Sequence, residues 1–317
     1  MTMSNIQTAQ RPRFDVMITQ TKFQKAINNT LQDPNRARSF TSAIISAVST
    51  NPSLQECDTG TIVNAALLGE SLNLSPSPQL SQYYLVPFND KKRDCKVAQF
   101  QLGYKGYLQL AMRSGHYRKI NVLSIKEGEL IKYDPLEEEI QVNLIDDEEQ
   151  REKANTIGYY AMFEYHNGFR KTLYWSKKKM MCHADKYSQA FSLNGSTFKS
   201  NGKTVTKVSF EEFEKGNYPP EDAWLYSSFW YKDFDGMAYK TMLRQLISKW
   251  GIMSIDLQEA FVKDMGVIND DSTVEYIDNP SSDDEVIIPQ DEPTVVETKE
   301  ELGNVPGETP SVSLDDI

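Results

Sequence analysis

The chain has 317 residues, with 34 basic and 45 acidic side chains and a formal net charge of −11. Hydrophobic residues make up 39% of it, below the usual share of a globular protein, so we expect part of the chain to stay outside the core. No run approaches the roughly 18 apolar residues that span a bilayer, and the polar N-terminus lacks the apolar run of a signal peptide, which predicts a soluble cytoplasmic protein without membrane contact.

Charge is distributed unevenly along the chain. Residues 264–317 contain 16 acidic residues and one basic residue, a net charge of −15, whereas residues 1–263 contain 33 basic and 29 acidic residues, a net charge of +4. Attraction to phosphate depends on charge within about a Debye length, roughly 8–10 Å. The mildly basic body therefore matters more for binding than the overall negative charge.

The N-terminal third is predicted to be helical after a flexible start over residues 1–20. From Thr21 to Asn51 apolar residues recur at helical spacing. A second helix begins at Asp58 or Thr59, either of which can cap it. It ends before Ser75-Pro76-Ser77-Pro78, which cannot continue a helix.

The next segment changes to the spacing of strands. Residues 83–86 and 97–102 read as two strands around a polar turn rich in cations. Residues 104–114 then read as a helix that Gly115 closes.

Residues 118–175 are predicted to be mostly strand, with a hairpin that turns at Asn167-Gly168. Ser176 caps a helix over residues 177–190. Residues 192–217 form a long loop whose Asn-Gly pairs favour a small extra hairpin.

The C-terminal part is predicted to contain a long helix in the second half of residues 223–250, followed by a disordered acidic tail. The fold class is therefore α+β, with N-terminal helices, central antiparallel strands with a hairpin, a long C-terminal helix and the tail. We expect a flexible N-terminus over residues 1–20, a DNA-binding and oligomerising body over 21–263 and the tail over 264–317.

The residues of common enzyme sites lack the required spacing. None of His116, His166 and His183 belongs to a metal-binding pattern such as H-E-x-x-H. The phosphate-loop candidate, Gly202-Lys203-Thr204, lacks the earlier glycine that a Walker A loop needs. The three cysteines are odd in number and have no CxxC spacing, which argues against a disulfide framework or a cysteine zinc site.

Cations and aromatic residues alternate between Phe88 and Lys119, and the predicted C-terminal helix adds more cations. Cations along a groove can follow a phosphate backbone, while aromatic faces can stack bases at about 1–3 kcal/mol each. Lys240 and Arg244 are four residues apart on one helix face, where like charges repel mildly and a phosphate would relieve the repulsion. Solvated lysines and core tyrosines would produce the same pattern, so composition alone leaves both interpretations open.

Several ordered motifs resemble the RecT family of phage single-strand annealing proteins, over roughly residues 40–260. The motifs are Tyr84-Leu85-Val86-Pro87-Phe88, Gln99 to Tyr107, Arg113-Ser114-Gly115, Glu127-Gly128-Glu129 and Met237 to Arg244. The resemblance implies a non-catalytic recombinase that anneals complementary DNA strands without ATP or another cofactor, with Mg²⁺ at most a counterion of the DNA. It also implies a ring or helical filament of identical subunits, a partner exonuclease, the host single-strand DNA-binding protein as a further partner, and a phage or prophage origin with a role in DNA repair.

By position, the resemblance implies that a DNA groove is formed by the cation-rich turn between the two predicted strands, the residues from there to Lys119 and the predicted C-terminal helix. Its residues are Lys91, Lys92, Arg93, Lys96, Gln99, Gln101, Tyr104, Lys105, Tyr107, Arg113, Arg118, Lys119, Lys240 and Arg244. The chain departs from the family at Tyr239, where a lysine is common, so Tyr239 either stacks on a base or packs.

Two other functions remain open from the sequence. A metal-dependent DNA nuclease could use the neighbouring carboxylates Glu127, Glu129 and Asp134 to hold Mg²⁺. A self-assembling structural protein would have no DNA role. The acidic tail either competes with DNA for the groove, offers a docking segment to a partner, or keeps the protein soluble.

Overall fold

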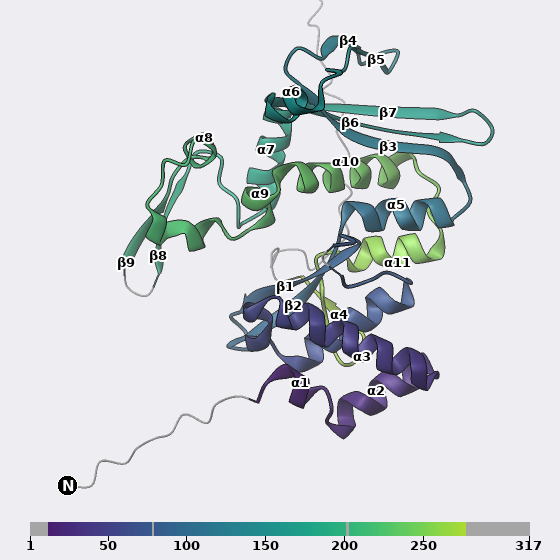
Figure 1. The fold of residues 1–317 in the computed structure, drawn as a ribbon, viewed down its shortest axis with the longest axis vertical. Coiled ribbons are helices and arrows are strands. Elements are labelled where there is room, and N and C mark those ends of the chain that lie inside the picture. Colours follow the sequence, from purple (N-terminus) through teal and green to yellow (C-terminus); the bar gives the residue numbers. More distant parts are fainter. Residues whose placement is uncertain (1–11, 78, 201–202, 277–317) are drawn as a thin grey trace, which may run out of the picture. The chain divides into compact units, whose positions relative to one another are not determined.

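The computed structural model describes residues 12–77, 79–200 and 203–276, and it confirms an α+β fold (Figure 1). Its named strands pair antiparallel, as the two-stranded sheets β1–β2, β4–β5, β8–β9 and β10–β11 and the three-stranded sheet β3–β6–β7. Across these described ranges, no helix is both long enough and apolar enough to cross a membrane.

The N-terminal part of the chain is helical, and aspartate side chains cap two of its helices, α3 and α4. The N-terminal helices are α1 (Phe14–Met17), α2 (Thr21–Leu31), α3 (Pro34–Ser49), the 3-10 helix η1 (Pro52–Glu56) and α4 (Thr59–Ser71). The predicted start of α4 is confirmed, because the Asp58 carboxylate accepts a hydrogen bond from the N–H of Thr61. The helix expected from Thr21 to Asn51 is divided at Asp33, which caps α3 ahead of a proline at its first position.

The prediction that residues 1–20 are flexible is wrong for the second half of that segment. Phe14, the first residue of the short helix α1, and Ile18, which follows its last residue, are buried in the core. Burial of these two apolar side chains offsets the entropy lost on ordering the segment. Residues 1–11 lie outside the described part.

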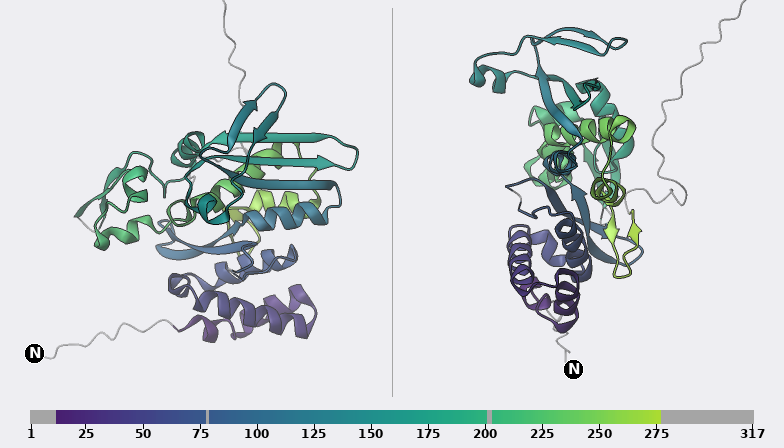
Figure 2. Two further views of the ribbon diagram at one scale, coloured as in Figure 1. Left: turned by 45° about the horizontal axis from the view of Figure 1, so that its top comes forward. Right: turned by 90° about the vertical axis from the view of Figure 1, so that its right-hand side faces the viewer.

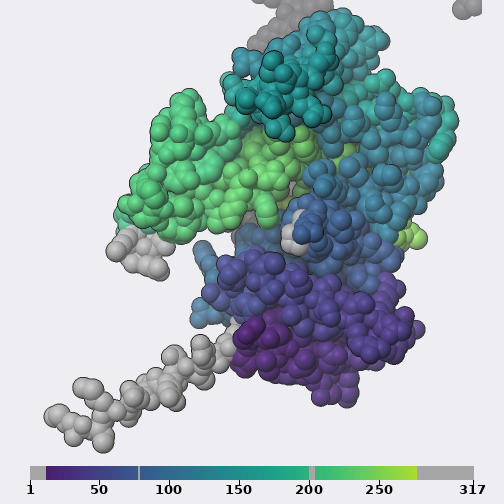
Figure 3. All heavy atoms as spheres, in the orientation of Figure 1, coloured from purple at the N-terminus to yellow at the C-terminus, as the bar shows by residue number. Residues whose placement is uncertain are grey.

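The predicted strand pair is confirmed as the hairpin of β1 (Tyr83–Asp90) and β2 (Cys95–Leu102), followed by helix α5 (Tyr104–Arg113). The hairpin lies against α4, and Figure 3 shows the N-terminal helices in purple beside this blue segment. The expected helix stop is also confirmed, since Gly115 has a φ of +72°.

The central sheet has the strand order β3–β6–β7 and is covered by helices. Its strands are β3 (Tyr117–Lys126), β6 (Thr156–Tyr165) and β7 (Arg170–Ser176). The predicted hairpin is confirmed, with Gly168 in its turn at a φ of +86°. Ser176 caps α7 (Lys177–Tyr187), and the long helix α10 (Phe234–Trp250) packs along the sheet (Figure 1).

Smaller elements complete the body, and Figure 2 shows them from two further directions. They are β4 (Leu130–Asp134), β5 (Glu139–Val142), α6 (Glu148–Lys153), β8 (Ser196–Ser200), β9 (Lys203–Lys207), α8 (Phe210–Glu214), the 3-10 helix η2 (Pro220–Tyr226), α9 (Phe229–Lys232) and α11 (Ile255–Lys263). The β8–β9 pair confirms the small extra hairpin predicted in the 192–217 loop.

Residues 264–276, which we call the C-terminal strap, belong to the folded body. The backbone of Phe100 accepts a hydrogen bond from Met265 N–H at 2.8 Å and donates one to the carbonyl of Gly266 at 2.9 Å. The strap continues as β10 (Val267–Ile268) and β11 (Val274–Glu275). The prediction of a disordered tail from Asp264 onward is therefore wrong for the strap. The rest of the predicted tail, 277–317, lies outside the described residues.

Gly106 has a steric role in joining α5 to β1. A Cβ atom at this position would lie 2.1 Å from the backbone carbonyl oxygen of Gln82, so Gly106→Ala forces the helix away from the strand. We expect a loss of about 1–3 kcal/mol in the free energy of unfolding, measured by urea denaturation. The matched control is Met112→Ala, which truncates a side chain that is 63% exposed on the same helix. Equal stability of the two variants would contradict this role.

Candidate nucleic-acid interface

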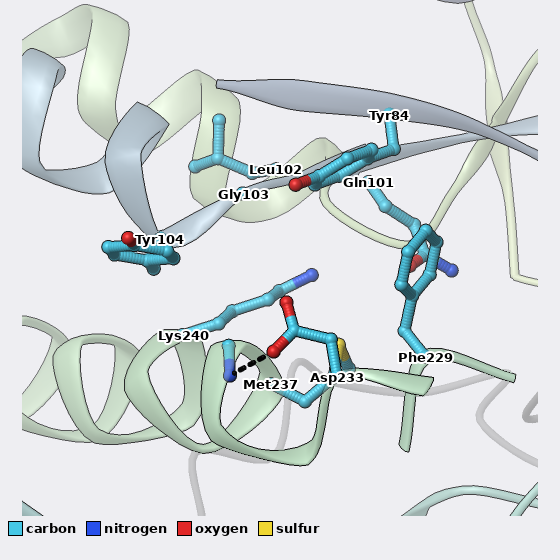
Figure 4. A pocket seen from close by; sticks show the side chains of 10 residues that line it. Tyr84, Gln101, Leu102, Gly103, Tyr104, Phe229, Asp233, Met237 and Lys240 are labelled. Carbon is cyan, nitrogen blue, oxygen red and sulfur yellow. Dashed lines mark hydrogen bonds between the residues drawn. The ribbon is translucent and has the colours of Figure 1, made fainter. Parts of the chain in front are cut away.

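Two of the segments that resemble RecT motifs, Gln99 to Tyr107 and Met237 to Arg244, meet where α5 packs against α10. The rings of Tyr104 and Tyr239 contact edge to face, with centroids 5.5 Å apart. Figure 4 shows the small pocket beside this contact, where Tyr84, Phe229 and Lys240 are among the lining residues. Tyr239, whose role the sequence left undecided, therefore packs against an aromatic neighbour in this structure.

Asp264 is the centre of a buried polar network beneath this contact. Its carboxylate accepts hydrogen bonds from the N–H of Leu102 at 2.8 Å and the hydroxyl of Tyr107 at 3.1 Å. It also forms ion pairs with Lys240 Nζ at 2.9 Å and Arg244 Nη1 at 3.1 Å. The Asp264 side chain is fully buried and that of Lys240 is 7% exposed. The network thus ties α11 to β2, α5 and α10.

The electrostatics of the network fit a structural role. Burial lowers the pKa of Lys240, and the Asp264 carboxylate opposes that shift. Burial also acts to lower the pKa of Arg244, but Tyr107 and Asp264 outweigh it and leave that pKa raised. A buried cation needs such a partner, because an unpaired charge in the interior is costly. Asp264 thus supplies the counter-charge that the sequence analysis assigned to a DNA phosphate.

The two predicted glutamines on β2 are also internal. Gln101 Nε2 donates to Gln99 Oε1 at 2.8 Å, and Gln99 Nε2 donates to the carbonyl of Met265 in the strap. Both residues are buried, as is Tyr107. Contact between these side chains and DNA stays a prediction, while their observed contacts hold the strap against the hairpin.

The cations of the β1–β2 turn lie on the surface, and several face acidic side chains. Glu275 of the strap pairs with Lys92 Nζ at 3.3 Å and with Arg93 Nη2 at 2.7 Å. Lys96 pairs with a glutamate of η1. Lys91 is exposed and forms no ion pair with any residue that the structure describes. The strap therefore covers part of the predicted DNA surface with negative charge.

The remaining predicted cations lie around α5 and the start of β3. Lys105 is exposed, with its Nζ 6.0 Å from the ring centroid of Tyr104. Arg113 donates to a backbone carbonyl at the end of α4, and Arg118 pairs with a glutamate of β6. Lys119 is exposed and, within the described ranges, without an acidic partner. The eight-residue strand β2, about 23 Å long at a rise of about 3.3 Å per residue, separates the turn cations from the start of α5.

The structure thus distributes the predicted residues over three places. Lys240, Arg244, Tyr107 and the two glutamines lie in or beside the interior. The turn cations lie at one end of the β1–β2 hairpin, and the α5 and β3 cations lie toward its other end. Whether DNA connects the surface groups stays a prediction.

The carboxylates that suggested a nuclease have separate local roles. Glu129 is fully buried, pairs with Arg151 Nε at 2.6 Å and accepts backbone hydrogen bonds. Asp134 accepts backbone hydrogen bonds in the turn between β4 and β5. Glu127 accepts a hydrogen bond from the side-chain amide of an asparagine. In the part of the chain that the structure describes, no three acidic, histidine or cysteine side chains gather as a metal site. Each of the three carboxylates therefore has a separate local contact in this structure, and the nuclease alternative stays a prediction.

Comparison with known proteins supports the resemblance that the sequence motifs indicate. The model of the RecT family matches residues 38–282. The chain is 36% identical over 260 residues to Uncharacterized protein YqaK of Bacillus subtilis (strain 168), across 82% of this chain and 73% of that protein. It is 26% identical over 215 residues to Protein RecT of Escherichia coli (strain K12), across 67% of this chain and 65% of that protein. The family match includes the hairpin, α5, α10 and Asp264.

Removal of the Asp264 charge should destabilise the whole fold. Asp264→Asn leaves Lys240 buried without its counter-charge, so we expect a loss of about 3–5 kcal/mol in the free energy of unfolding, measured by urea denaturation. The control is Asp256→Asn, because Asp256 is an exposed residue of α11, the helix that ends just before Asp264. A loss for Asp264→Asn no larger than that of the control would contradict a structural role for the network.

Proposed function

We propose, from the fact that this chain belongs to the RecT family, that it coats single-stranded DNA and anneals it to a complementary strand without ATP. The observation that carries the proposal is the family match over residues 38–282, which spans both motif segments and the packing contact between them. We further propose that the protein acts in recombination and DNA repair as a ring or helical filament of identical subunits. A partner exonuclease would supply the single strands in the bacterial cytoplasm, in the presence of the host single-strand DNA-binding protein.

Annealing needs charge neutralisation more than a reactive group. Two DNA strands repel each other, and a cationic surface lowers that repulsion as it releases counterions. Exposed cations without an acidic partner in the described chain suit this task, and Lys91, Lys105 and Lys119 meet that description. Base pairing then supplies the specificity. The proposed function therefore requires no catalytic residue and no cofactor, with Mg²⁺ acting only as a counterion.

Oligomerisation follows from the modest charge of one subunit. Residues 1–263 carry a net charge of only +4, and the four acidic residues of the strap reduce the net charge of residues 1–276 to zero, so each subunit holds a few nucleotides weakly. A strand that contacts many subunits at once gains avidity, because each further contact becomes intramolecular. Release of the annealed product remains possible, since each single contact stays weak.

The proposed activity predicts duplex formation from two labelled complementary oligonucleotides, faster than in the absence of protein and independent of ATP. The strands should keep their full length when Mg²⁺ is present, which denaturing gel electrophoresis measures. Shortened strands would support the nuclease alternative. No acceleration and no binding of single strands would support the structural alternative.

Substitution of two surface lysines should weaken DNA binding equally for all sequences. The double variant Lys105→Gln, Lys119→Gln should lower the slope of log affinity against log salt by about 1.4, at about 0.7 for each lost contact to a single strand. Fluorescence anisotropy with several oligonucleotides over a salt series measures this. The control is Lys153→Gln, whose side chain is 80% exposed on α6. Loss of affinity for one sequence alone would contradict a backbone contact.

The strap should compete with DNA at the β1–β2 turn. Glu275→Gln removes the only ion pair of Lys92 in the described chain and one of the two of Arg93, which keeps Asp90 at 3.1 Å, so we expect single-strand affinity to rise about two- to fivefold at low salt and the difference to vanish at high salt. The matched control is Glu259→Gln, which breaks an ion pair with Lys263 on α11. An unchanged affinity at low salt would show that DNA does not use these turn cations.

A further inference from the structure

Helix α7 carries an aromatic row that the sequence analysis did not include in the groove. His183 contacts Trp175 of β7 at a ring-centroid distance of 5.3 Å and Tyr187 of the next helical turn at 4.6 Å. Lys179, one turn before His183, places its Nζ 4.5 Å from the centroid of the Trp175 ring. We call Trp175, Lys179, His183 and Tyr187 the α7 row. It begins at the end of β7, where α7 leaves the central sheet (Figure 1).

The α7 row is accessible at its far end. Tyr187 is 48% exposed, so part of its ring faces solvent. Trp175 and His183 are partly buried and hold the row in place. Burial, with help from Lys179 and Lys186, lowers the pKa of His183 to about 4. The ring of His183 is therefore neutral at physiological pH and contributes a flat aromatic face.

Unpaired cations border this row. Lys178 and Lys186 are exposed and lie two turns apart on the neighbouring stripe of α7. Lys186 also places its Nζ 5.2 Å from the Tyr187 ring centroid. Neither lysine, nor Lys179, forms an ion pair with another described residue, in contrast to Lys92, Arg93 and Lys96 of the hairpin. The surface of α7 therefore combines exposed aromatic area with positive charge that is not neutralised within the described body.

We propose that the α7 row is a base-stacking platform, where a base of the single strand stacks on Tyr187 while Lys178 and Lys186 bind the neighbouring phosphates. A positively charged surface with stackable aromatic rings is the general arrangement for single strands, and stacking tolerates any sequence because every base has a π-face. The proposal rests on the proposed single-strand binding and adds to it a contact surface and its mode of recognition.

The native cysteines allow a direct test on the unmodified protein. Cys182 lies between Lys178 and Lys186 on the same helical stripe and is exposed, whereas Cys95 is exposed at the β1–β2 turn and Cys57 is buried. We expect saturating oligothymidylate to slow the alkylation of Cys182 by iodoacetamide about fivefold or more, quantified by mass spectrometry of the modified peptides. An abasic oligonucleotide of the same length should protect less, because it offers phosphates without bases. Cys95 reports separately on the hairpin.

A set of variants tests the stacking contact itself. Tyr187→Ala should raise the Kd for oligothymidylate about fivefold or more, whereas Tyr187→Phe should leave it within about twofold, because the ring and not the hydroxyl carries the contact. The control is Trp224→Ala, which removes a ring that is 55% exposed on η2. Thermal unfolding of each variant reports on its fold, and truncation of an exposed side chain should leave it intact.

The outcomes separate this proposal from the proposed function. A wild-type protein that binds and anneals DNA while Cys182 reacts at an unchanged rate, or while Tyr187→Ala binds like wild type, would overturn the platform alone. Equal protection by the abasic and thymidine oligonucleotides would overturn the stacking contact. A wild-type protein that does not bind oligothymidylate would overturn the platform together with the proposed function.

Discussion

The burial of one carboxylate, Asp264, is the constraint on which the arrangement of the body depends. Its oxygens satisfy a backbone N–H of β2, a hydroxyl of α5 and two cations of α10. A carboxylate in the interior is tolerated only when such partners are in place, and Lys240, which is 7% exposed, depends on Asp264 in turn. The network therefore couples elements far apart in sequence. The strap can cover the hairpin because the buried contacts of Asp264, its first residue, fix where it begins.

Local signals predicted much of the fold. Asp58 and Ser176 cap their helices as expected, and Gly168 has a positive φ in the turn of the predicted hairpin. Caps and tight turns depend on atoms within a few residues, so a sequence window contains the whole cause. The local patterns did not predict that α1 and the strap are folded, and the reason is the opposite one. Both short segments are held by distant partners, Gln55 for α1 and the backbone of Phe100 for the strap, which no local pattern reveals.

The candidate site was predictable in composition but not in arrangement. The lysine and arginine of α10 share a face, as their spacing indicates, yet that face turns inward to Asp264. A sequence shows that two like charges need a counter-charge but not whether protein or ligand provides it. The acidic residue in question stood at the start of an apparently disordered segment. The aromatic row of α7 was equally hidden, because Trp175 and His183 meet only after β7 and α7 pack together.

Intramolecular ion pairs also affect how tightly such a protein could bind DNA and how readily it could release it. Lys92 and Arg93 already have a carboxylate partner in Glu275, so a phosphate that reaches them exchanges one ion pair for another. The net gain of each exchange is small and sensitive to salt, because surface ion pairs contribute little. Stacking depends less on salt, so an exposed ring can retain a strand while the phosphate contacts exchange. A surface that combines the two contacts would let bases search for their complement without loss of the strand from the assembly.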